Sequence, residues 1–240
     1  MSTATTPSAP LSRGTLSWWG QAQTVLAKDV RIELRSGEVV TTSGFFAVLL
    51  VVMASFSLYG GPMSRRLVVA AVVWLSVAFA AVLALGRAWQ RERDESAMAG
   101  LVVSPLSPSA LFCGKAVALA GFLVVIECLV IPLASLLFAV DLLEMGPGLL
   151  LIALCATPGV AATGTLFGAM TVRTRARDLM LAVVLFPLLS PTLLSAVAGT
   201  RELLGGASLA ELGDYFRLMG VFDLVFIAGG LALFGLLLED

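Results

Sequence analysis

Six long apolar stretches constrain this chain more than any other feature of its sequence. A helix needs about 20 apolar residues to cross a hydrocarbon core of ~30 Å. Backbone polar groups cannot stay unpaired in lipid, and barrel strands would appear as alternating segments of about ten residues. We therefore predict an all-α membrane protein with six transmembrane helices. The six stretches are residues 44–61, 67–86, 115–139, 147–170, 179–200 and 218–238.

The composition of the chain agrees with a lipid environment. Apolar residues make up 59% of the 240 positions and charged residues 13%, against about 45–50% and about 25% in soluble domains. A globular fold of this length has too little interior for that excess. The net charge of −1 gives a nucleic-acid partner no electrostatic support. We expect the lipid bilayer to be the main surroundings and no nucleic acid to bind.

The residue types exclude most kinds of catalytic and metal centre. The chain has no histidine, which removes HExxH zinc sites, histidine-based triads and imidazole ligation of haem. Cys113, Cys128 and Cys155 lie in or beside apolar stretches, where cysteine packs as a small hydrophobic residue. The Gly114-Lys115 pair lacks the other residues of a phosphate-binding loop. We predict no catalytic residue, no metal and no directly bound cofactor, so that any ATP is hydrolysed by a partner subunit.

Two segments precede the first apolar stretch. Residues 1–16 are rich in Ser, Thr, Pro and Ala and are predicted to be a disordered tail, with no apolar core of a signal peptide. Residues 17–38 are predicted to form an amphipathic helix in the membrane interface, or else an ordinary juxtamembrane anchor. Glu33 lies close to the apolar side and is expected to have a partner. The apolar stripe is Trp19, Ala22, Leu26, Val30 and Leu34, and the basic side is Lys28, Arg31 and Arg35.

The distribution of basic residues predicts the orientation in the membrane. With both termini inside, the inner segments hold eleven of the 15 Lys and Arg residues and the outer loops hold four. Cytoplasmic loops carry the excess of positive charge. We therefore predict a multi-pass protein of the bacterial inner membrane with both termini cytoplasmic. The inner residues are Arg13, Lys28, Arg31, Arg35, Arg87, Arg91, Arg93, Lys115, Arg173, Arg175 and Arg177, and the outer ones are Arg65, Arg66, Arg201 and Arg217.

The loop at residues 87–115 has more sequence features than a simple connection between two helices needs. Arg91 and Glu95 stand at helical i,i+4 spacing, and Ser107-Pro108 is suited to begin the next helix. The apolar segment between them favours a docking surface, although a solvated loop remains an alternative. The predicted coupling residues are Arg91, Glu92, Arg93, Asp94, Glu95, Met98, Leu101, Val102, Ser104 and Pro105.

Two features within the apolar stretches are candidates for function or packing. Glu127 stands near the centre of the third stretch. An ionisable residue at that depth costs at least ~2.5 kcal/mol and usually faces a cavity or a partner. The alternative is a structural Glu that a Ser or Thr of a neighbouring helix holds by a hydrogen bond. Gly164 and Gly168 in the fourth stretch predict close helix packing, within the chain or at a dimer seam.

An interfacial helix, six spans and a helical first cytoplasmic loop resemble the ABC-2 class of transporter permeases. The matching residues in the loop are Glu92-Arg93-Asp94, Leu101, Ser104 to Ser107 and Gly114-Lys115, while Ser96 and Ala99 depart from the pattern of the class. Within the class the chain is most similar to the heme exporter protein B (CcmB-type) family. That similarity rests on AKDVRIELRSGEVVTTSGFF (27–46), SPLSPSALFCGK (104–115), FPLLSPTLLSAV (186–197) and the C-terminal DYFRLMGVFDLVFIAGGLALFGLLLED.

The resemblance implies a permease subunit in cytochrome c biogenesis, with residues 44–238 as its transmembrane domain. It further implies a cytoplasmic ABC ATPase partner, a homodimer, assembly with a haem-handling membrane protein, and haem as a possible substrate. The alternatives are an ABC-2 permease for a lipid, drug or polysaccharide, and a membrane assembly factor that transports nothing. An integral-membrane enzyme is disfavoured by the missing histidines and paired carboxylates.

The predicted orientation can be tested by labelling single cysteines. A cysteine that replaces Arg175 should react with a membrane-impermeant reagent only after the membrane is opened, because residue 175 lies in a basic inner loop. A cysteine in the outer segments at residues 62–66, 140–146 or 201–217 should react in intact cells. Labelling of residue 175 from outside would reverse the orientation.

Overall fold

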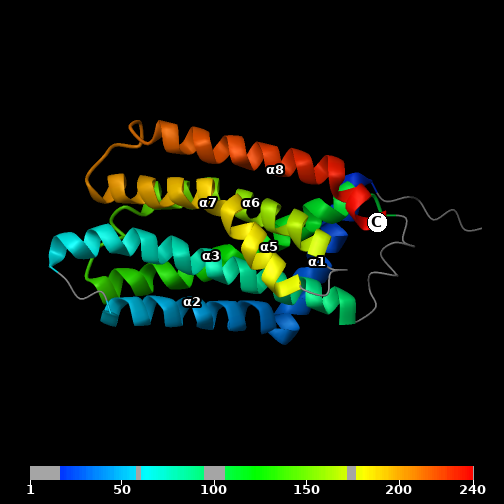
Figure 1. The fold of residues 1–240 in the computed structure, drawn as a ribbon, viewed down its shortest axis with the longest axis horizontal. Coiled ribbons are helices and arrows are strands. Elements are labelled where there is room, and N and C mark those ends of the chain that lie inside the picture. The colour runs from blue at the N-terminus through cyan, green and yellow to red at the C-terminus, as the bar shows by residue number, and fades with distance from the viewer. Residues whose placement is uncertain (1–16, 58–60, 95–105, 172–176, 240) are drawn as a thin grey trace, which may run out of the picture.

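The computed structural model describes residues 17–57, 61–94, 106–171 and 177–239. Within these ranges the chain forms seven helices arranged as an elongated bundle (Figure 1). The predicted disordered tail at residues 1–16 lies outside the described residues. The helices are α1 (Trp18–Ser36), α2 (Glu38–Ser57), α3 (Pro62–Asp94), α5 (Pro108–Phe138), α6 (Gly146–Thr171), α7 (Arg177–Leu204) and α8 (Gly213–Glu239).

The prediction of an all-α membrane protein with six spans is confirmed. Six helices of the described chain, α2 to α8, are long and apolar enough to cross a membrane. Each overlaps one predicted stretch, although the structure extends several of them. The first span begins at Glu38 instead of residue 44, and the third begins at Pro108 instead of residue 115. Polar residues at these ends continue the helices, because a helix can extend beyond the apolar stretch that crosses the hydrocarbon core.

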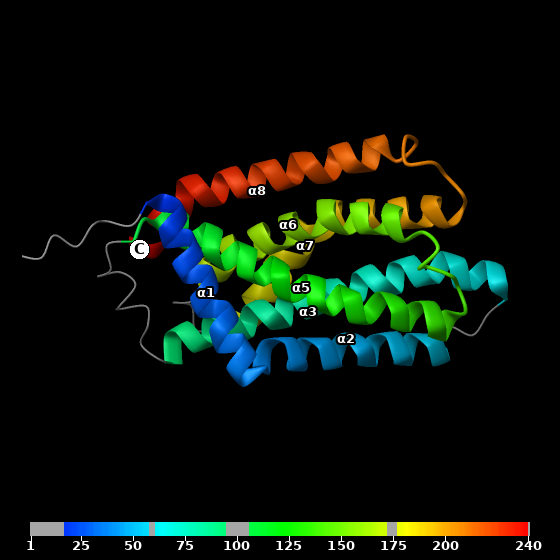
Figure 2. The same cartoon turned by 180° about the vertical axis from the view of Figure 1, so that it is seen from behind.

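The connections divide between the two ends of the bundle (Figures 1 and 2). The turns at residues 139–145 and 205–212 lie at one end, beside the start of α3. The start of α2, the end of α3 and the start of α5 lie at the other end with the C-terminus. This alternation places the predicted outer and inner segments at opposite ends. Which end faces the cytoplasm stays a prediction, and the names inner end (with the C-terminus) and outer end (with residues 139–145) are used below only as labels for the two ends.

A short corner joins α1 to α2. Gly37 adopts a left-handed conformation with φ 62° and ends α1 by donating its N–H to the carbonyl of Glu33. The buried side chain of Glu33 accepts the backbone N–H of Val40 at 2.8 Å and so satisfies a donor in the first turn of α2. The expectation that Glu33 has a partner is therefore confirmed.

Helix α1 lies obliquely across the inner end of the bundle (Figure 2). Its buried residues are Ala22, Val25 and Glu33, while Trp19 and Leu34 of the predicted apolar stripe are 68% and 82% exposed. The stripe is therefore turned partly away from the protein. That is the arrangement that an interfacial helix needs, since its apolar side must face lipid. The interfacial location itself stays a prediction.

Close contacts at glycines join α6 to α3. A Cβ added at Gly164 would collide with the side chain of Leu85, and one at Gly168 with the indole of Trp89. Gly164 and Gly168 thus lie against α3 of the same chain. Small residues at such positions let helix backbones approach in lipid.

A second apolar cluster lies at the outer end of the bundle. Trp74 of α3 donates its indole N–H to Thr200 of α7 at 2.9 Å, which satisfies both groups inside the protein. Leu212 and Met219 are fully buried in the same cluster. The predicted outer loop at residues 201–217 is shorter in the structure, because α7 continues to Leu204 and α8 begins at Gly213.

Prolines occur inside three of the spanning helices. Pro132 lies in α5, Pro158 in α6, and Pro187 and Pro191 in α7. Figure 1 shows α7 changing direction part-way along its length. Proline removes a backbone donor and is a usual cause of helix bends.

Candidate functional site

The inner end of the bundle is organised around the crossing of α1 and α5. At Gly114 the two helices approach so closely that an added Cβ would meet the carbonyl oxygen of Ala22 and the side chain of Val25 at 2.7 Å. Only glycine fits this contact without displacing α1. The crossing therefore fixes α1 against the first turns of α5, directly after the predicted coupling segment.

Polar contacts reinforce the crossing near the start of α5. The indole N–H of Trp18 donates to Ser109 Oγ at 2.9 Å. Gln21 Oε1 accepts both the backbone N–H of Ser107 at 2.8 Å and the Ser107 hydroxyl at 3.1 Å. Helix α5 begins at Pro108, as the Ser107-Pro108 pair indicates, but the Ser107 hydroxyl does not cap it. The hydroxyl is used instead to hold the chain to α1.

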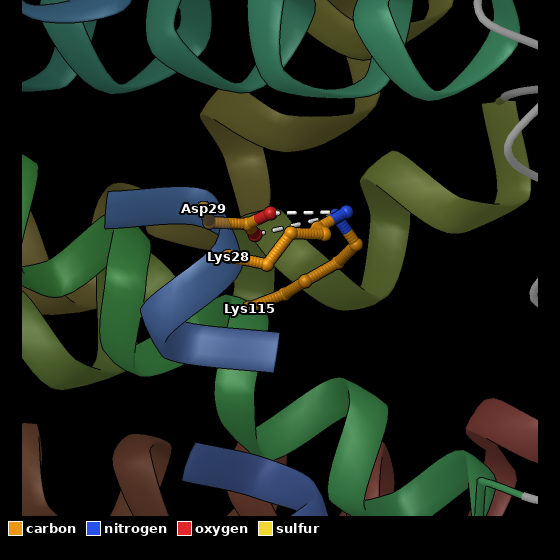
Figure 3. Close-up of polar contacts among 3 residues, drawn as sticks. All are labelled: Lys28, Asp29 and Lys115. Carbon is orange, nitrogen blue, oxygen red and sulfur yellow. Dashed lines mark hydrogen bonds and ion pairs between the residues drawn. The ribbon is translucent and has the colours of Figure 1, made fainter. Parts of the chain in front are cut away.

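A buried ion pair lies at the centre of the crossing (Figure 3). Lys115 Nζ stands 3.4 Å from Asp29 Oδ2, and the two side chains are 7% and 17% exposed. The other oxygen of Asp29 is 3.2 Å from Lys28 Nζ. The ammonium group of Lys115 also lies over the Trp89 ring, 5.0 Å from its centroid, in cation–π contact. Lys115 thus joins α1, α5 and α3.

Trp89 connects this cluster to the rest of the bundle. It is buried near the end of α3, beside Gly168 of α6, with its ring centroid 6.3 Å from that of Phe234 in α8. Phe234 in turn lies 5.4 Å from Phe112 of α5. Aromatic pairs at these separations attract beyond their buried area. Four spanning helices and α1 therefore meet within contact of Trp89 and Lys115.

The predicted coupling residues are only partly covered by the structure. Arg91, Glu92, Arg93 and Asp94 belong to the last turns of α3, so this part continues the second span and does not start a separate helix. The other predicted coupling residues, Glu95, Met98, Leu101, Val102, Ser104 and Pro105, lie outside the described residues. The described chain on both sides of residues 95–105 belongs to the contact network of Trp89 and Lys115.

Glu127 lies inside the bundle between α5 and α6. It is 3% exposed, and the hydroxyl of Thr157 donates to its Oε1 at 2.6 Å. Among the described residues, no Lys or Arg forms an ion pair with it. Glu127 also lines an apolar groove between the two helices. The structure thus combines the two sequence alternatives, a hydrogen-bonded Glu and a Glu that faces a cavity.

A second acid of the membrane-spanning region was missed by the sequence reasoning. Asp223 lies in α8 with its Oδ1 enclosed and without a hydrogen-bond partner among the described residues. The carboxylate occupies the space over Gly159 of α6, where an added Cβ would collide with it. The signal was present in the sequence, because Asp223 is an ionisable residue within the last apolar stretch.

Comparison with known proteins gives a consistent similarity over most of the chain. A family model described as CcmB protein matches residues 21–234. Heme exporter protein B of Rhodobacter capsulatus is 28% identical over 175 residues, which cover 71% of this chain and 78% of that protein. Heme exporter protein B of Pseudomonas aeruginosa is 29% identical over 185 residues, covering 76% and 81%. The matched family region runs from α1 to within α8.

The ion pair in the α1–α5 crossing predicts unequal effects of removing its two charges. Asp29→Asn takes the carboxylate from both lysines, whereas Lys115→Met leaves Asp29 beside Lys28. We expect Asp29→Asn to lower the free energy of unfolding by about 3–5 kcal/mol and Lys115→Met to lower it by less. The double variant should be more stable than the sum of the two losses implies. Denaturation of the purified protein would measure this coupling.

The exposed pair Arg217–Asp214 provides the matched control for that experiment. Arg217→Ala should leave stability unchanged, since exposed pairs contribute little. Additive losses in the Asp29 and Lys115 variants would mean that the two side chains do not depend on each other.

Proposed function

The chain belongs to the CcmB protein family, and from that premise we propose that it is the membrane subunit of an ABC transporter in cytochrome c biogenesis. The subunit couples ATP hydrolysis by a separate cytoplasmic ATPase to the export or release of haem on the outer face of the bacterial inner membrane. The name that the two relatives share, heme exporter protein B, supports haem as the substrate. ATP is bound and hydrolysed by the partner.

The observation that carries the proposal is the network on both sides of residues 95–105. Trp89 precedes this segment and Lys115 follows it, and the two side chains contact each other. Lys115 is paired with Asp29 of α1, and α1 leads through Gly37 directly into α2. A displacement of the segment by a docked ATPase would therefore reach α1, α3 and α5 together. This connectivity supports a coupling role.

The docking surface in this proposal is the predicted coupling segment. Its apolar residues Met98, Leu101 and Val102 enter a cleft of the ATPase, and Arg91, Arg93 and Glu95 form the polar rim. Burial of each apolar side chain contributes about 1.5–3 kcal/mol, whereas each rim pair contributes about 1 kcal/mol or less. Binding therefore depends mainly on the apolar residues.

The assembly in this proposal contains two copies of the chain, the ATPase and a haem-handling membrane protein. The family resemblance supports these partners. The excess of Lys and Arg in the predicted inner segments supports cytoplasmic termini, and with them an ATPase on the inner side.

Substitutions in the coupling segment test the docking surface. Leu101→Asp should abolish capture of the ATPase, because it places a charge in the apolar contact. Arg93→Ala should only weaken capture and make it more sensitive to salt. Both variants should still insert in the membrane, since neither changes an apolar stretch. Pull-down of the ATPase with each variant is the measurement, and undiminished capture by Leu101→Asp would place the docking surface elsewhere.

Glu127→Gln tests whether the intramembrane acid takes part in function. The isosteric amide keeps an oxygen that can accept the Thr157 hydroxyl, so the protein should fold and accumulate normally. We expect cytochrome c maturation in a complemented strain to fall, because the ionisable group is lost. Loss of the protein itself would assign Glu127 a structural role, and unchanged maturation would remove it from the mechanism.

A further inference from the structure

A groove of about 540 Å³ runs between α5 and α6 within the membrane-spanning region. Its walls are almost entirely apolar, with Val124 and Ile131 on α5 and Leu150 and Leu154 on α6. Leu143, in the connection between the two helices, lies at its outer end. Sites for small molecules usually occupy about 300–1,000 Å³ and combine apolar walls with a few polar groups. The groove has these dimensions and this composition.

Glu127 provides a polar group that is fixed in position. Thr157 holds its Oε1, while Oε2 has no hydrogen-bond partner among the described residues. Among the described residues, Ser43 Oγ and Asp223 Oδ1 are the side-chain atoms that are fully enclosed and have no hydrogen-bond partner. Oε2 of Glu127 also lacks a partner but is not fully enclosed, so it is accessible. The groove is the space that Glu127 lines. An oxygen in hydrocarbon without a hydrogen-bond partner is unfavourable, which gives a ligand with a matching group an advantage.

The depth of Glu127 limits what can reach it. It stands 11 residues before the end of α5 at Phe138, or about 16 Å along the helix. A charged headgroup cannot be drawn that far into the hydrocarbon without a large cost. No Lys or Arg lines the groove, so it also has nothing to neutralise an anionic ligand such as the carboxylates of haem. The matching ligand is therefore uncharged.

We propose that this groove binds an uncharged lipid that carries a hydroxyl group, which enters sideways from the bilayer and forms a hydrogen bond with Glu127. A hydroxyl both donates and accepts, so it fits the carboxyl group in either protonation state. The apolar walls hold the chain of the lipid. A passing helix fits less well, because Leu142 and Leu143 of the connection at residues 139–145 also line the groove.

Photolabelling of the full chain in inner-membrane vesicles tests the proposal. The probe is hexadecanol with a diazirine on its chain, and the comparison probe is the corresponding alkane, which can neither donate nor accept a hydrogen bond. Mass spectrometry of the peptides from α5 and α6 measures the labelling. We expect the alcohol to label the groove about fivefold more than the alkane, which is the effect of one hydrogen bond. In Glu127→Met this preference should disappear.

Two glycine variants provide a matched pair. Gly121 lines the groove, and a Cβ added there meets open space, so Gly121→Leu places an apolar side chain in the groove. Gly220 of α8 is equally open but lies away from the groove, and Gly220→Leu is the control. Labelling should fall at least about fivefold in the first variant and stay unchanged in the second.

Several results would overturn the proposal. Equal labelling by alcohol and alkane would remove the role of Glu127, and full labelling of Gly121→Leu would place the probe elsewhere. Displacement of the probe by haemin would identify the groove as a substrate site. Absence of labelling in the vesicles would mean that another helix or a second copy covers it. Labelling requires no ATP and no transport, so its outcome is independent of the proposed export function.

Discussion

Close approach of helix backbones at small residues is the constraint on which the rest of this bundle depends. In lipid, burial of apolar side chains gives no net drive for helices to associate, so packing must hold them together. Gly168 admits the indole of Trp89, and Gly230 admits the ring of Phe112, each where a Cβ would collide. These contacts bring large aromatic groups to the inner end of the bundle. Lys115 contacts Trp89, one of these aromatic groups, and pairs with Asp29 of α1.

At the inner end, hydrogen bonds and an ion pair hold the helices together in addition to apolar packing. The crossing of α1 and α5 combines the close contact at Gly114 with hydrogen bonds from Trp18 and to Gln21. Lys115 and Asp29 are both largely buried, which makes their geometry important, because a buried charge that loses its partner is costly. The described helices on both sides of residues 95–105 are joined in this network.

The fold and family could be predicted from sequence, whereas the contacts between helices could not. The six spans follow from apolar length, and the family from four stretches in order, and both predictions are confirmed. The partners of Lys115 were beyond prediction, since Asp29 is 86 positions away and no local pattern indicates the crossing of α1 over α5. Glu127 was found because charge in an apolar stretch is conspicuous. Asp223 carries the same signal in the last apolar stretch but was missed.

Three consecutive residues of α6 lie beside two acidic side chains that come from different neighbouring helices. Thr157 donates to Glu127 of α5, Gly159 leaves room for Asp223 of α8, and Pro158 between them supplies no backbone N–H. The two acids are not equally satisfied, because Asp223 Oδ1 has no hydrogen-bond partner among the described residues. Of the most apolar window of each span, 72% is buried in α6 and only 11% in α8. The unsatisfied acid thus lies on the span whose apolar window is least buried, and it faces α6, the helix against which α8 packs most extensively in the described chain.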